Sequence, residues 1–102
     1  MSYEYPDKVT FYKSSVGTAA VEIVPGGAGQ CIVVVTNDDG VDDLYVGWDS
    51  SVSATTGTHF TGGLLAPAGT ITLNPWRGPI WLEGEAAGVD YRVEVRSVTR
   101  TA

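Results

Sequence analysis

Hydrophobic and polar residues alternate in short stretches along this chain, and no window of about a dozen residues keeps the three-to-four spacing of an amphipathic helix. Glycine, proline or β-branched residues interrupt every such window. Runs rich in Val, Ile, Thr, Tyr and Trp are instead separated by Gly and Pro, as strands are separated by turns. The pattern predicts an all-β protein.

The runs predict an antiparallel β-sandwich, or a jelly-roll-like barrel, of about seven to eight strands. The expected strands lie at about Lys8–Lys13, Ala19–Val24, Gln30–Asn37, Leu44–Trp48, Thr70–Leu73, Ile80–Glu83 and Val89–Val98. A chain of 102 residues has the size of one domain. We therefore expect a single β-sandwich domain over residues 1–102, with a short N-terminal arm at about residues 1–7.

Period-two alternation assigns the core side of these strands, because every second side chain of a strand faces the same way. The predicted core residues are Val9, Phe11, Val21, Ile23, Leu44, Val46, Trp48, Ile71, Leu73, Ile80, Leu82, Tyr91, Val93 and Val95. Arg92, Glu94 and Arg96 alternate with the last of these and are expected to project outward. Residues 31–35, CIVVV, are apolar on both faces and predict a central strand, or one whose outer face another segment or subunit covers.

Several turns and one long irregular segment are recognisable between the strands. PGGAG and NDDG are turn sequences, and APAG and NPWRGP predict rigid turns on both sides of Ile71–Leu73. The segment Asp49–Gly69 exceeds the usual loop length, so it is either functional or partly strand-forming around His59 and Phe60.

The chain has a formal net charge of −6, which opposes non-specific binding to nucleic acid. Acidic residues cluster in residues 38–49, whereas Arg92, Arg96 and Arg100 lie near the C-terminus. This asymmetry suits either head-to-tail contacts between subunits or a solvated surface. The single cysteine excludes an intramolecular disulfide, and the sequence predicts neither a signal peptide nor a membrane span.

Candidate catalytic residues are few, because the chain has one His and one Cys. Cys31 lies inside an apolar run and is expected to be a small core residue. His59 lacks a second His or a zinc-type Cys spacing. We expect no enzyme, no cofactor and no catalytic or metal-binding residue; a hydrolase would have to use Asp and Glu pairs alone.

Two further groups of residues leave alternatives open. Asp38, Asp39, Asp42 and Asp43 form either a solvated turn or a weak calcium site, although their spacing does not match an EF-hand loop. The aromatic side chains are either structural or a platform on which a sugar ring stacks, with Trp81 the ambiguous one because it alternates with Ile80 and Leu82. The aromatic residues concerned are Tyr45, Trp48, Trp76 and Trp81.

Five segments follow one another in a distinctive order: VVVTNDD, LYVGWDSSVSATTGT, LLAPAGTITL, GPIWLEGEA and VDYRVEVRSV. In this order the chain resembles small β-sandwich virion proteins of tailed phages, most of all capsid decoration (cement) proteins of phages of actinobacterial hosts. The resemblance spans about residues 16–98. The last segment departs from the V-D-x-R-V-x-E-V pattern of that family in the register of its acidic residue.

The resemblance implies a non-enzymatic structural role. Such proteins bind the outside of an assembled capsid as homo-oligomers, usually trimers, and add contacts that resist internal DNA pressure. The implied partners are the major capsid protein and further copies of the chain, without direct nucleic-acid or membrane binding. The implied location is the capsid exterior of the virion, after synthesis in the host cytoplasm. The alternative is a phage tail or head-fibre component, or a carbohydrate-binding adhesin module.

Tryptophan and arginine are enriched among the residues that dominate protein–protein contacts. Trp76, Arg77 and Trp81 lie in or next to the rigid NPWRGP turn, so they are the leading contact candidates. Tyr3 and Tyr5 in the N-terminal arm form a second candidate contact. These five residues are the interface hypothesis that the sequence provides.

Overall fold

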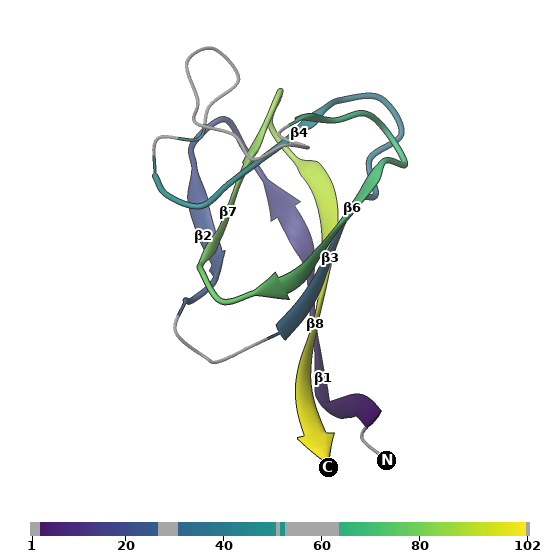
Figure 1. Ribbon diagram of the computed structural model, residues 1–102. Helices are drawn as coiled ribbons and strands as arrows, with labels where there is room; N and C mark the ends of the chain where they lie inside the picture. The colour runs from purple at the N-terminus through teal and green to yellow at the C-terminus, as the bar shows by residue number, and fades with distance from the viewer. Residues whose placement is uncertain (1–2, 27–30, 51, 53–63, 102) are drawn as a thin grey trace.

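In the part of the chain that the structure describes, two four-stranded antiparallel sheets pack face to face (Figure 1). The computed structural model describes residues 3–26, 31–50, 52 and 64–101, and the side chains within these ranges from residue 9 to residue 97. The strands are β1 (Tyr3–Val16), β2 (Val21–Val24), β3 (Cys31–Asn37), β4 (Leu44–Gly47), β5 (Leu64–Leu65), β6 (Thr70–Trp76), β7 (Ile80–Gly84) and β8 (Val89–Thr101). No helix in the described ranges is long and apolar enough to cross a membrane.

The strands pair in a nested order, the first with the last, the second with the last but one, and so on inward. β1 pairs with β8, β2 with β7, β3 with β6 and β4 with β5, all antiparallel. Pairing of β3 with β8 and of β4 with β7 then joins them into the sheets β1-β8-β3-β6 and β2-β7-β4-β5. This nested pairing is that of the jelly roll. The all-β sandwich predicted from the alternation is therefore confirmed.

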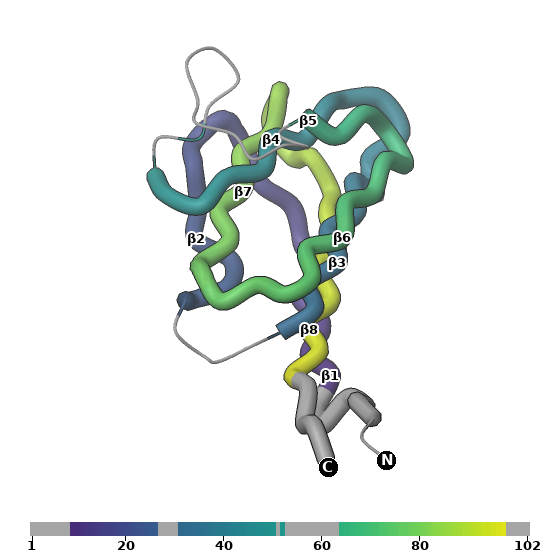
Figure 2. The backbone as a smooth tube through the Cα atoms, viewed as in Figure 1, coloured from purple at the N-terminus to yellow at the C-terminus, as the bar shows by residue number. Residues whose placement is uncertain are grey.

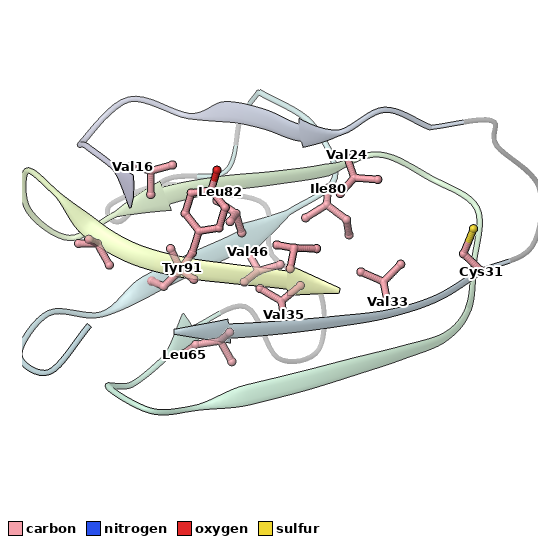
Figure 3. Close-up of a cluster of buried hydrophobic side chains, with 13 residues drawn as sticks. Val16, Val24, Cys31, Val33, Val35, Val46, Leu65, Ile80, Leu82 and Tyr91 are labelled. Atoms are coloured by element: carbon pink, nitrogen blue, oxygen red, sulfur yellow. The ribbon is translucent and has the colours of Figure 1, made fainter. Parts of the chain in front are cut away.

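The core lies between the sheets, and both contribute to it (Figure 3). Its fully enclosed strand residues come from β3, β4, β7 and β8, and Val52, in the segment after β4, is also 1% exposed. The buried core residues are Val16, Val24, Cys31, Val33, Val35, Leu44, Val46, Leu65, Ile80, Leu82, Val89, Tyr91 and Val93. Ile23, Ile71, Leu73 and Val95 pack against them partly buried. β3 lies between β8 and β6, as the CIVVV run predicted.

The prediction that Val9 and Phe11 are core residues is wrong. Their side chains are 42% and 62% exposed. In the pairing of β1 with β8, Val9 lies opposite Arg96 and Phe11 opposite Glu94, so both share the outward face of these charges. Tyr12, opposite the buried Val93, packs against the core instead. A shift of one residue exchanges the two faces of a strand, and pairing with β8 determines which face of β1 is buried.

Two further predicted core residues are more exposed than expected. Val21 is 45% exposed because β2 is the edge strand of its sheet, although it pairs with the buried Leu82. Trp48 is 36% exposed because β4 ends one residue earlier, at Gly47, and the alternation of Leu44 and Val46 does not continue to it.

Several strand ends also differ from the predicted boundaries. β1 begins at Tyr3, and the backbone of its first residues, predicted as a separate arm, pairs with residues 98–101 of β8. β6 continues through Trp76, which was expected in a turn. The segment after β4 contains the two-residue strand β5 and then a turn at residues 66–69 that leads into β6 (Figure 2). His59 and Phe60 lie outside the described residues.

Candidate interaction surfaces

The acidic loop, residues 38–43 between β3 and β4, is fixed by the side chain of a buried asparagine. Asn37, the last residue of β3, is 0% exposed. Its Nδ2 donates hydrogen bonds to the carbonyl oxygens of Asp42 and Leu65, both at 2.9 Å. Its Oδ1 accepts a hydrogen bond of 2.9 Å from the backbone N–H of Asp39. A buried amide with these three bonds ties the loop to the chain preceding β6.

Asp39 completes the acidic loop. Its Oδ2 accepts hydrogen bonds from the backbone N–H groups of Val41 at 3.0 Å and Asp42 at 2.7 Å. These bonds, that from Asp42 first, hold the pKa of Asp39 below its ordinary value of 3.8, since they favour the charged carboxylate. The loop thus places Val41, 82% exposed, at its tip among carboxylates.

No three His, Cys, Asp or Glu side chains in the described ranges form a group that could hold a metal ion. The carboxylate of Asp39 is occupied by the backbone of its own loop. On this geometry the four aspartates form an ordered acidic turn, and the calcium hypothesis gains no support from it.

The outward face of the β1-β8-β3 part of the first sheet combines apolar and cationic side chains. We call it the mixed face. Cross-strand pairing aligns Phe11 with Glu94 and Val34, and Val9 with Arg96 and Ile32. Lys13 and Arg92 form the next row. The mixed face consists of Val9, Phe11, Lys13, Ile32, Val34, Arg92, Glu94 and Arg96. Arg92, Glu94 and Arg96 project outward, as their alternation with Tyr91 and Val93 predicted.

Two ion pairs organise the charges on and beside the mixed face. The Nε of Arg96 bonds to a carboxylate oxygen of Glu94 on the same strand. Nη2 of Arg92 lies 3.8 Å from Oδ1 of Asp38, which links the mixed face to the acidic loop.

Beside this pair, an open depression is lined by Lys13, Ser14, Asp90 and Tyr91, among others. Burial raises the pKa of Tyr91 above its usual value of 10.0, so this phenol stays neutral.

Trp76 and Arg77, two of the predicted contact residues, lie where β6 turns into β7. Trp76 is partly buried against the core and pairs with Cys31. It lines a small apolar cavity of about 20 Å³ with Val24, Cys31 and Val33. Arg77 is exposed beside it. Trp76 therefore closes one end of the core, and Arg77 is the more accessible of the two.

Trp81, the third predicted contact residue, lies on the outer face of the second sheet. It alternates with the buried Ile80 and Leu82, and it pairs with Glu22 and Gly47. Its side chain is half-buried. Tyr45 lies on the same face, opposite Glu83. The pKa of Tyr45 is raised above 10.0, mainly by burial and then by the negative charges of Glu85, Asp43 and Glu83.

The other two predicted contact residues, Tyr3 and Tyr5, lie on β1, a different strand from those that carry Trp76 and Trp81. The backbone of Tyr3 and Tyr5 pairs with Thr101 and Thr99 of β8, and their side chains lie outside the described residues, as does His59. Cys31 is buried, as expected of a core residue. The five predicted contact residues thus lie on three different parts of the molecule.

The sequence interpretation missed the mixed face and the apolar tip of the acidic loop. Phe11 was assigned to the core, and Val41 was not considered. The signal for Phe11 is the competing alternation of Thr10, Tyr12 and Ser14, which the sequence interpretation did not use. The signal for Val41 is a valine placed between two pairs of aspartates.

Comparison with known proteins finds a likeness among solved structures. No known family model and no curated protein matches the sequence. Among solved structures, this chain is similar to a chain in the acidic stable capsid structure of Helicobacter pylori bacteriophage KHP30, with a TM-score of 0.52 and 15% sequence identity. The superposition covers 100% of this chain and 99% of that chain. At this identity the likeness concerns the fold, and it extends over the whole eight-stranded sandwich.

Proposed function

We propose that this protein is a non-enzymatic structural protein of a phage virion that binds the outer surface of the capsid. In this proposal it acts as a homo-oligomer, a trimer, and stabilises the capsid against internal pressure. Its partners are the major capsid protein and further copies of itself. The observation that carries the proposal is the full-length likeness of its jelly roll to a chain in a phage capsid structure. The resemblance of its sequence segments, in their order, to decoration proteins of phages of actinobacterial hosts is in line with the same role.

The described surface also supports a role in binding rather than catalysis. The single cysteine is buried in the core, and the carboxylate of Asp39 is held by its own loop. Exposed apolar side chains lie on the mixed face and at the loop tip instead. Such side chains suit contacts with other proteins.

Co-sedimentation tests the proposal. The purified chain is mixed with shells assembled from the major capsid protein of the same genome, and pelleting is measured against chain concentration. We expect saturable binding at a fixed ratio to capsid subunits. Absence of pelleting at every concentration would contradict the proposal.

Variants then locate the contact. Arg77→Glu and Trp81→Ala are expected to weaken pelleting, whereas Thr18→Ala, beside the far end of β7, is expected to leave it unchanged. Trp76→Phe is preferred to alanine because Trp76 packs against the core. Unchanged pelleting of the folded Arg77 and Trp81 variants would remove these residues from the contact.

A second candidate function is a carbohydrate-binding adhesin, or a tail or head-fibre component. The observation that favours it is the placement of Trp81 and Tyr45 on one outer sheet face, since aromatic faces stack on sugar rings and jelly rolls occur in lectins. A glycan array combined with tryptophan-fluorescence titration tests it. Saturable quenching by a glycan, lost in Trp81→Ala, would favour the adhesin over the capsid protein.

A further inference from the structure

The acidic loop and the mixed face are complementary in both charge and hydrophobicity. The acidic loop presents Val41, 82% exposed, which lies in sequence between the pairs Asp38–Asp39 and Asp42–Asp43. The mixed face presents Phe11, 62% exposed, and Val9, 42% exposed, with cations beside them. An apolar tip with carboxylates in its loop matches an apolar patch that has Lys13 and Arg96 beside it.

The cations are concentrated on the mixed face. Among the side chains that the structure describes, Lys13, Arg92 and Arg96 project from it, and Arg77 lies at the β6–β7 turn. Glu94 is the acidic group among the residues of the mixed face, and it is paired with Arg96. At the edge of this face, Arg92 pairs with Asp38, and Asp90 lines the same depression as Lys13. The mixed face thus carries three cations and one carboxylate, with Asp38 and Asp90 at its edge, on a chain whose net charge is −6.

The acidic loop is held in one shape before any contact forms. Asn37 and Asp39 fix its backbone through five hydrogen bonds to main-chain groups, between 2.7 and 3.0 Å. A segment that is already ordered loses less conformational entropy on binding than a mobile one. The loop is therefore suited to insert its tip into a neighbour.

We propose that the occupant of the mixed face is the acidic loop of a second copy of this chain. In the proposed arrangement each copy gives its acidic loop to one neighbour and its mixed face to another, so the contact is head-to-tail, and it closes into a ring when the rotation between copies allows. Phe11 and Val9 contact Val41 of the neighbour, and Lys13 and Arg96 face its aspartates. This inference rests on the proposed homo-oligomer and assigns the surfaces that hold it together.

Paired charge reversals test the contact. One variant carries Asp42→Lys and Asp43→Lys in the acidic loop, and the other carries Lys13→Glu and Arg96→Glu on the mixed face. Asp39 is kept because it holds the loop. Each variant, and then their equimolar mixture with one isotopically labelled, is studied by sedimentation velocity and native mass spectrometry. Circular dichroism and thermal unfolding verify that each variant folds.

We expect the wild type to self-associate, and to do so more weakly at high salt. Each reversal alone should raise the dissociation constant of self-association by about tenfold or more. It should therefore be monomeric at concentrations at which the wild type associates. The mixture should form species that contain both chains, since each altered surface then meets its complement. Recovery on mixing also excludes misfolding as the cause of the loss.

Uncharged variants examine the apolar part of the contact. Val41→Ser and Phe11→Ser should each weaken association by about tenfold. Leu64→Ser is the matched control, because Leu64 is 52% exposed on β5 of the other sheet, and it should associate like the wild type.

Three results would overturn the inference: a wild type that is monomeric at every concentration, reversals that associate like the wild type, or a mixture that forms no mixed species. These outcomes are distinct from failure of the proposed function. A monomer that still pellets with capsids would keep the capsid role, and reversals that associate normally but no longer pellet would assign the mixed face to the capsid protein.

Discussion

The two faces of the β1-β8-β3-β6 sheet differ in what covers them, and two neighbouring residues of β3 show the difference. Val35 is 0% exposed because the second sheet covers the inner face. Val34, the preceding residue in the chain, points the other way and is only partly buried, between Glu94 and Thr72. The residue type and the strand are the same. The inner face therefore stabilises the fold, and the outer face is available for association.

The largest effect is expected where β3 ends. Asn37→Ala removes the three side-chain hydrogen bonds that join the acidic loop to the chain before β6. Because it leaves buried backbone groups without partners, it should lower the free energy of unfolding by about 3 kcal/mol. Urea denaturation measures this. A loss below about 1 kcal/mol would mean that the loop does not depend on Asn37.

The comparison of Val35 with Val34 can be made directly. Val35→Ala removes two buried methyl groups and leaves a cavity, so it should cost about 2 kcal/mol and lower Tm by roughly 10 °C. Val34→Ala is the matched control and should change stability by less than about 0.5 kcal/mol. Equal losses in the two variants would show that the outer face is also covered in the single chain.

A third variant, in the turn before β6, should stabilise the fold without changing the mixed face. The APAG turn places Ala68 at φ 66°, a left-handed conformation that favours glycine, and closes with the Gly69 N–H bonded to the Ala66 carbonyl oxygen at 2.8 Å. Ala68→Gly relieves this strain and should raise the free energy of unfolding by up to about 1 kcal/mol. Differential scanning calorimetry should show a higher Tm with unchanged self-association. A lower Tm would contradict the assignment.

The smallest effect on the free energy of unfolding is expected when the pH is lowered. The folded pKa of Asp39 is lowered, so its contribution to stability is present above about pH 4 and is lost as the pH falls through the folded pKa. Asp39→Asn cannot ionise, and its unfolding free energy should depend less on pH between about pH 5 and about pH 2. Denaturation curves at several pH values measure the difference. Parallel pH profiles for the two proteins would contradict it.

The core side of a strand could be predicted where apolar and polar residues alternate along it. Where they do not alternate, the core side could not be predicted. In β8, charged residues alternate with Tyr91 and Val93, which leaves one possible core side. In β1, Phe11 and Tyr12 offer apolar groups on both sides, and only pairing with β8, some 80 residues away, chooses between them. β5 has two residues and therefore no period.

The candidate surfaces were predicted less well, for the same reason. The alternation found the outward charges Arg92 and Arg96, but it placed Phe11 inside. Nothing local indicates that Asn37 is buried, because its partner Leu65 lies 28 positions further along the chain. Long-range pairing determines both features. The predicted contact residues Arg77 and Trp81 remain proposals for the capsid contact.

Reconstruction by cryo-electron microscopy of shells incubated with the purified chain tests the central claim most directly. The account predicts density for an eight-stranded sandwich on the outer surface, repeated at symmetry-related positions, with neighbouring copies in contact. A bare outer surface after incubation with an excess of folded chain would contradict it.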